Sequence, residues 1–138
     1  MDILEKCRTP LHWTILYKEY DEALSIVKDG SVDINEIDYR HNTAMVYLLR
    51  KLRELRRLET KPNEKQIMLY EAMIIHPSID LEQTSESGKS IREYIIDCKI
   101  PELYDIIFQH TKWIYDDLMT SIMFDNKYVF SLTKLLLK

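Results

Sequence analysis

Apolar residues recur along most of this chain at the spacing of an amphipathic α-helix. Leu48, Leu52 and Leu55 follow one another at i, i+4 and i+7. The stretch from Asp21 to Gly30 carries a second apolar face, made of Ala23, Leu24, Ile26 and Val27. Glycine and proline, which β-sandwiches and barrels need for their many tight turns, occur only two and four times. The pattern therefore predicts an all-α fold.

Residues that start and end helices divide this pattern into segments. Thr9 is expected to cap the first helix, with Pro10 in its first turn, and Asp21 to cap the second. The alternation of apolar and polar residues at 32–35 predicts one arm of a hairpin between the second and third helices. Four antiparallel helix pairs are expected, over about 9–19, 21–29, 44–58, 62–76, 91–98, 101–109, 116–124 and 128–137.

The order of turn and helices repeats along the chain. Thr43 lies 34 residues after Thr9, and Gly88-Lys89-Ser90 begins a third unit. No helix pair of this size buries its apolar side alone, whereas stacked pairs form one continuous core. The repetition therefore predicts a stack of similar units.

Thr9-Pro10-Leu11-His12 matches in full the motif of the ankyrin repeat, a unit of about 33 residues with a finger and two helices. Gly30 and the segment 33–35 resemble the finger motif of that family, with one residue inserted. The chain is thus similar to ankyrin-repeat proteins. The resemblance implies one all-α domain, 1–138, an ankyrin-like solenoid of about four helix pairs with short hairpin or loop fingers. Its repeats are expected at about 5–37, 38–84, 85–111 and 112–138.

Several positions depart from the family pattern. Cys7 and His41 replace the usual turn glycine, while Thr43 and Ser90 keep the helix cap but lose the proline and histidine. The second repeat carries about a dozen extra residues between its helices. Degenerate arrays of this kind resemble ankyrin proteins of viruses and intracellular pathogens. In the family motif the position of His12 is structural.

No arrangement of residues typical of catalysis is evident. The four histidines lack the i, i+4 spacing of a helical metal site, and there is no glycine-rich phosphate loop. Cys7 and Cys98 are far apart and are expected to be reduced thiols. Asp116 and Asp117 are better explained by helix capping than by acid–base chemistry. We therefore expect no enzyme activity, no cofactor and no metal.

Charge and hydropathy indicate the surroundings of the protein. The net charge of −4 disfavours general binding to nucleic acid. The first six residues lack an apolar signal segment, and no stretch approaches the ~20 apolar residues of a membrane span. We expect a soluble cytoplasmic protein without membrane contacts, within a host cell if its source is a virus or pathogen; the oligomeric state stays open.

The resemblance implies that a partner protein contacts the finger tips and the exposed sides of the first helices. Tyrosine and arginine at such positions are typical of binding hot spots, although ordinary exposed turn residues explain the set equally well. Trp13 and Trp113 are expected to fill the core. The candidate protein-binding residues are Tyr17, Tyr39, Arg40, Asn42, Arg50, Lys51 and Lys89.

A basic stripe follows on the extended third helix. Arginine binds carboxylate or phosphate with a planar fork, so this stripe is an alternative site for nucleic acid or another anionic surface. The competing interpretation is a solvated helix partly neutralised by Glu54 and Glu59. The leading hypothesis is a non-enzymatic protein-binding module that inhibits or diverts a host or competitor protein. The stripe consists of Arg53, Arg56, Arg57 and Lys61.

Overall fold

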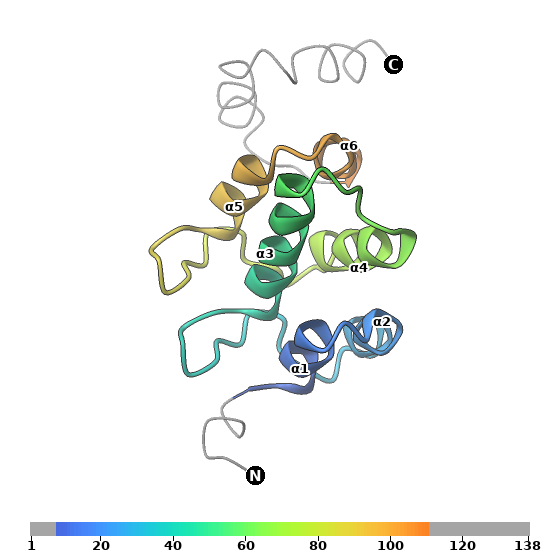
Figure 1. Cartoon of the computed structure of the whole chain (residues 1–138). Helices are drawn as coiled ribbons and strands as arrows, with labels where there is room; N and C mark the ends of the chain where they lie inside the picture. The colour runs from blue at the N-terminus through green and yellow to red at the C-terminus, as the bar shows by residue number, and fades with distance from the viewer. Residues whose placement is uncertain (1–7, 111–138) are drawn as a thin grey trace.

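The computed structural model describes residues 8–110 of the chain. The helices in this range are α1 (Pro10–Leu16), α2 (Tyr20–Asp29), α3 (Ala44–Arg57), α4 (Glu64–Ile74), α5 (Ile91–Cys98) and α6 (Pro101–His110) (Figure 1). Residues 8–110 contain no strand, only an isolated bridge between Thr84 and Ser90. The all-α prediction is thus confirmed for this range. The helices expected at 116–124 and 128–137, and Trp113, lie outside it.

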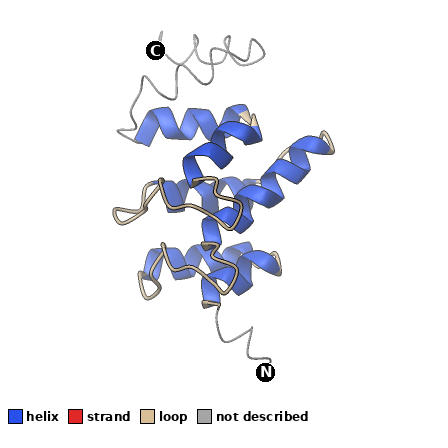
Figure 2. Ribbon diagram, turned by 90° about the vertical axis from the view of Figure 1, so that its left-hand side faces the viewer, coloured by secondary structure: helices blue, strands red, loops and turns tan. Residues whose placement is uncertain are grey.

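The helices stack as three consecutive pairs. One row runs from α1 through α3 to α5, and the second from α2 through α4 to α6. The loops before α3 and α5 project to the same side of the stack, and we call them the first finger (residues 30–43) and the second finger (residues 75–90). Figure 2 looks onto that side and shows one finger above the other. Each finger therefore ends at the start of the first helix of the next pair, α3 or α5.

Thr9 and Ser90 cap their helices as the sequence predicts, and Asn63 adds a cap that the sequence analysis did not name. The Thr9 side chain accepts a hydrogen bond from the His12 amide, and the His12 ring accepts one from the Thr9 amide, which completes a capping box. Asn63 and Gln66 form a second capping box at α4. Ser90 accepts from the Glu93 amide at the start of α5. These local bonds explain why the helices begin where they do.

Three local expectations are wrong. Asp21 lies in the first turn of α2, since that helix begins at Tyr20 after Glu19, whose side chain makes no capping bond. Thr43 has the backbone of a cap, but its hydroxyl makes no capping bond. The segment 32–35 forms turns instead of a hairpin arm, because no second strand lies beside it within the described chain.

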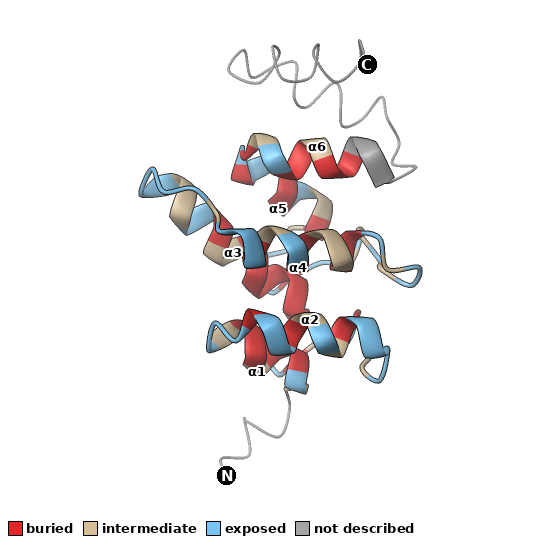
Figure 3. Ribbon diagram, turned by 90° about the vertical axis from the view of Figure 1, so that its right-hand side faces the viewer, coloured by how far each residue is buried: buried red, intermediate tan, exposed pale blue. Residues whose placement is uncertain are grey.

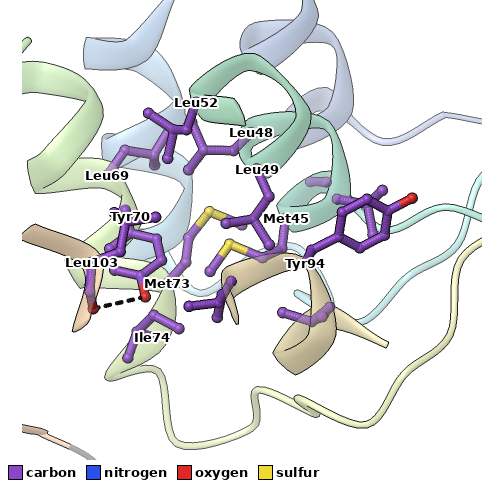
Figure 4. Close-up of a cluster of buried hydrophobic side chains, with 14 of the residues drawn as sticks. Met45, Leu48, Leu49, Leu52, Leu69, Tyr70, Met73, Ile74, Tyr94 and Leu103 are labelled. Carbon is purple, nitrogen blue, oxygen red and sulfur yellow. Dashed lines mark hydrogen bonds between the residues drawn. The ribbon is translucent and has the colours of Figure 1, made fainter. Parts of the chain in front are cut away.

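Most of the largest fully buried side chains among residues 8–110 lie on the middle pair, α3 and α4 (Figure 4). Burying each such side chain contributes about 1.5–3 kcal/mol, so α3 and α4 hold the neighbouring pairs together. Leu48 and Leu52 are fully buried, as their helical stripe predicts, whereas Leu55 is half-buried. The Tyr70 hydroxyl is satisfied by the Leu103 carbonyl at 3.2 Å. The remaining buried side chains of this cluster include Met45, Leu49, Leu69, Met73 and Ile74.

The helix α3 is longer than its counterparts. It has 14 residues, compared with 7 in α1 and 8 in α5. Its last turns project from the stack and carry mostly exposed and half-buried residues (Figure 3). We call residues 51–57 the α3 extension; together with the loop 58–63 it accommodates much of the extra length expected in the second repeat.

Candidate interaction surface

Each finger ends in the same tight turn. The His41 amide donates to the Asp38 carbonyl at 2.9 Å, and the Gly88 amide donates to the Ser85 carbonyl at 3.0 Å. His41 has a φ of 63° and Gly88 a φ of 84°, so both lie in the left-handed region. The sequence prediction that His41 replaces a turn glycine agrees with this geometry. The turns therefore present residues 39–41 and 86–88 in equivalent positions.

A tyrosine from the following helix supports each turn. The Tyr47 hydroxyl donates to the Asp38 carboxylate. The Tyr94 hydroxyl lies 3.3 Å from the Ser85 hydroxyl and 3.0 Å from that of Ser87. Both tyrosines are buried. Each follows the first residue of its turn by nine positions, so the two supports are equivalent in sequence as well.

Arginine side chains lie between the aromatic rings of the first helices. The Arg8 guanidinium carbon is 5.2 Å from the ring centre of Trp13 and 5.5 Å from that of Tyr47. The Arg50 guanidinium carbon is 5.9 Å from Tyr47 and 5.8 Å from Tyr94. Such contacts are each worth about 0.5–1 kcal/mol at exposed sites. We call these five residues the cation–aromatic column; it connects all three helix pairs.

Acidic side chains neutralise the cations along the column. Burial raises the pKa of the Asp38 carboxyl, but hydrogen bonds from Tyr47, Asn42 and Arg8 outweigh burial and hold it below its ordinary value of 3.8. Asp38 is therefore ionised near neutral pH and fixes Arg8. The two cations of the column are thus each paired with a carboxylate. The ion pairs are Arg8–Asp38 at 3.1 Å, Arg50–Glu86 at 3.3 Å and Lys89–Asp97 at 2.5 Å.

An exposed layer lies on this column. Tyr17 stacks on Trp13 with ring centres 5.4 Å apart and remains 66% exposed. Tyr39 lies 4.9 Å from the Arg8 guanidinium carbon and is 38% exposed. Arg40 donates to the Tyr39 hydroxyl at 3.2 Å and is exposed. The structure thus brings Tyr17, Tyr39 and Arg40 together on one ordered surface.

Trp13 and Asn42 differ from the sequence prediction. Trp13 is half-buried at the end of the column instead of filling the core. Asn42 is fully buried, and its side chain accepts from the Glu86 amide at 3.1 Å and donates to the Glu86 carboxylate at 3.3 Å. Because its polar atoms already bind the second finger, Asn42 is a structural link between fingers and is not exposed to a partner.

The remaining candidates occupy different places. Arg50 and Lys89 belong to the column surface, since Lys89 lies 5.8 Å from the Tyr94 ring. Lys51 instead lines a groove beneath the α3 extension. The groove is formed against the connection between α1 and α2, which carries Lys18. The expected set is therefore divided between two surfaces.

The basic stripe is divided as well. Arg53 lies 5.5 Å from the Tyr94 ring and extends the column surface. Arg56 donates to the Lys99 carbonyl at 3.4 Å. Arg57 forms an ion pair with Glu54 at 2.5 Å. Lys61 lies beyond the helix in the loop 58–63, where it lines a pocket together with Arg56.

No three histidine, cysteine, aspartate or glutamate side chains among residues 8–110 gather as metal ligands. The Cys98 thiol is buried and donates to the Leu49 carbonyl at 3.5 Å. Burial raises the pKa of this thiol to about 12, so it stays protonated at neutral pH. Within this range no helix has both the length and the apolar character needed to cross a membrane.

The buried tyrosines that support the finger turns were not among the residues predicted from the sequence. Tyr47 and Tyr94 were not singled out, although both follow an equivalent turn by nine positions. Trp13 lies 34 positions before Tyr47, which equals the spacing of Thr9 and Thr43. An alignment of the three units to each other would have shown this column of aromatic residues.

The chain matches no protein-family model, no curated protein and no solved structure.

Proposed function

We propose that this chain is a non-enzymatic protein-interaction module of the ankyrin type. It binds a partner protein through the finger tips and the exposed residues above the cation–aromatic column. The observation that carries the proposal is the ordered layer of Tyr17, Tyr39 and Arg40 over that column. The full ankyrin motif at residues 9–12 and the stacked helix pairs support the fold part of the proposal.

Preorganisation favours binding at this surface. Side chains that become ordered only on association cost about 0.5–1.5 kcal/mol each. Here Tyr17 is already held by Trp13, and Tyr39 by Arg8 and Arg40. A partner therefore meets two exposed rings in fixed positions. Tyrosine gives a large amphipathic contact with few rotatable bonds, which suits a binding hot spot.

The charge pattern indicates the kind of partner. Arg8, Arg50 and Lys89 each have an acidic neighbour, so the surface does not need a strongly acidic ligand. A protein surface with mixed polar and apolar groups fits it better than a uniformly charged polymer. A module of this kind inhibits or diverts its partner by covering the surface that it binds.

The alternative function is binding of nucleic acid or another anionic surface through the basic stripe. Arg53 and Arg57 are the exposed arginines of that stripe. Its division between the column, the Lys99 carbonyl and Glu54 disfavours a continuous phosphate-binding track. Strong dependence of binding on salt concentration would nevertheless distinguish this alternative.

The partner is first captured by affinity purification with the natural chain as bait. Two double variants are then compared with the natural chain for their affinity for this partner. Tyr39→Ala/Arg40→Ala should weaken binding by about thirtyfold or more, because loss of a hot-spot residue commonly costs at least ~2 kcal/mol. Its free energy of unfolding should change by no more than ~0.5 kcal/mol per exposed site. Affinity is measured by calorimetry and stability by urea denaturation.

The variant that tests the basic stripe is Arg53→Glu/Arg57→Glu. Because Arg53 borders the column surface at Tyr94, this variant should weaken binding of the partner slightly, and far less than Tyr39→Ala/Arg40→Ala does. Full affinity in the tyrosine–arginine variant, together with loss in the Arg53/Arg57 variant, would move the site to the basic stripe and support the alternative function.

A further inference from the structure

The α3 extension builds a groove that is separate from the cation–aromatic column. The groove has a volume of about 550 Å³ and lies between the extension, the loop 58–63 and the connection from α1 to α2. Lys51, Leu55 and Leu58 face it from successive turns of α3 and its end. Lys18 and Lys61 contribute from the neighbouring segments. The α3 extension and its end therefore supply one wall of the groove.

The lysines of this groove lack the acidic neighbours that the column provides. Within residues 8–110, Lys18, Lys51 and Lys61 form no ion pair. The only carboxylate in the lining is Glu54, and it is held by Arg57 at 2.5 and 3.0 Å. The groove is thus locally basic in a chain of net charge −4. This arrangement keeps three ammonium groups available to an anion.

Burial and mutual repulsion make the uncompensated charge costly. Lys51 is half-buried, and burial together with the charge of Lys18 lowers its pKa. An anionic ligand placed between these two lysines would relieve the repulsion. Lys61, which is exposed, would attract the same ligand at the rim.

Two leucines give the groove an apolar wall, and a hydrogen-bonded pair of side chains forms its base. Leu58 is 59% exposed, and Leu55 is half-buried beside it. At the base, the Gln66 amide donates to the buried Tyr20 hydroxyl at 3.2 Å. Gln66 is itself fixed by the capping box with Asn63. A ligand therefore needs an apolar group for the leucines as well as negative charge for the lysines.

We propose that this groove binds an acidic peptide segment of a partner protein, with one apolar side chain seated against Leu55 and Leu58 and flanking carboxylates bound by Lys18, Lys51 and Lys61. Charge complementarity indicates the acidic character of the segment. Small molecules usually bury most of their surface in enclosed pockets, whereas this groove is rimmed by the exposed residues Leu58, Thr60 and Lys61. An extended segment or helix that keeps one side in water fits such a groove better. The extra residues of the second repeat thus form a second docking site, independent of the column.

The experiment uses the full chain labelled with nitrogen-15 and a synthetic peptide of glutamates with two central leucines. Titration should give saturable amide shifts at Lys18, Lys51, Leu58 and Lys61. A peptide with glutamine in place of every glutamate, and one with serine in place of both leucines, should each bind at least about tenfold more weakly, which corresponds to ~1.4 kcal/mol. Equal binding of all three peptides would overturn the proposal.

Matched charge reversals locate the site. Lys61→Glu should weaken binding of the acidic peptide about tenfold, whereas Lys28→Glu on the exposed surface of α2 should change it little. Leu58→Ser should also weaken binding. Equal effects of Lys61→Glu and Lys28→Glu would show diffuse charge attraction and contradict a groove site.

Two further outcomes separate this inference from its alternatives. Tyr39→Ala/Arg40→Ala should bind the acidic peptide normally, so failure of the column as a binding surface would leave the groove result unaffected. If dodecanoate shifts the same groove amides and the peptide does not, the occupant is a small amphiphilic anion and the peptide proposal is wrong.

Discussion

At the scale of single residues, His12 connects the first helix to the first finger. Its Nδ1 atom lies 3.2 Å from the Thr9 amide nitrogen and its Nε2 atom 2.9 Å from the Asn42 carbonyl oxygen. An amide can only donate and a carbonyl can only accept, so the neutral ring carries its proton on Nε2. Protonation of Nδ1 would direct a second donor at the Thr9 amide. Burial, the largest effect, lowers the pKa of this histidine below 6.5.

This environment predicts a pH dependence of stability. In the unfolded chain His12 takes up a proton near its ordinary pKa of 6.5, whereas in the folded chain it does so only at lower pH. Its contribution is therefore fully present above about pH 6.5 and is lost as the pH falls from there through the folded pKa. Urea denaturation between pH 7.5 and pH 5.5 should show decreasing free energy of unfolding.

The control for this prediction is His12→Gln. It should lower the free energy of unfolding at pH 7.5 by about 1–3 kcal/mol, because the Thr9 amide and the Asn42 carbonyl lose their hydrogen bonds to the imidazole ring. It should also reduce the difference in free energy of unfolding between pH 7.5 and pH 5.5. A variant with the same slope as the natural chain would show that other groups cause the pH dependence.

At the scale of helices, two threonines at equivalent positions have different environments. The Thr9 hydroxyl caps α1 by accepting from the His12 amide at 3.3 Å. The Thr43 hydroxyl has the same place at α3 but is buried without a hydrogen-bond partner among residues 8–110. The sequence pattern assigned a cap to both. Thr9 shares its capping box with His12, whereas Val46 stands at the equivalent position after Thr43 and has no ring to complete one.

Replacing each threonine with valine should therefore have unequal effects. Thr9→Val should lower the free energy of unfolding by about 1 kcal/mol, the usual cost of a lost cap. Thr43→Val keeps the shape and removes an unsatisfied polar group, so it should be neutral or stabilising by up to about 1 kcal/mol. Thermal and urea denaturation of both variants measure the difference. A loss at Thr43 as large as that at Thr9 would show that its hydroxyl is bonded in solution.

At the scale of the whole molecule, hydrogen bonds between units connect the three helix pairs. The Asn42 carbonyl binds His12 of the first unit, and the Asn42 side chain binds Glu86 of the second finger. A second link runs parallel to it at the base of the fingers. There the Asn35 side chain donates to the Ser78 carbonyl at 2.6 Å and accepts from the Asp80 amide at 2.8 Å. The fingers are thus held to each other as well as to their helices.

The two links should differ in their effect on stability. Asn42→Ala leaves the part-buried Glu86 amide unpaired and should lower the free energy of unfolding by about 1–3 kcal/mol. The Asn35 bonds are exposed, and water can replace them, so Asn35→Ala should cost less than about 1 kcal/mol. Denaturation followed by far-ultraviolet circular dichroism checks both values. A larger loss for Asn35 than for Asn42 would contradict the role of Asn42 as the buried link.

The sequence by itself determined the helices and most of their limits. Helix periodicity and capping are local properties, so the starts near Thr9 and Ser90 and the core positions Leu48 and Leu52 were predictable. The ankyrin motif also indicated that exposed tyrosine and arginine would gather at the first finger. The assignment of repeats rests on that motif and on the recurring order of turns and helices along the chain.

Tertiary structure decided which side chains face a neighbour and which face water. Asn42 was predicted to be an exposed turn residue, yet the second finger covers it. Its contact with Glu86 joins residues 44 positions apart, so no local sequence pattern could show it. Lys51 was assigned to the partner surface, but the longer α3 places it in the groove with Lys18. A helical pattern defines a face without showing what packs against it. The column and the groove both arise from contacts between units, so only stacking of the helix pairs creates them.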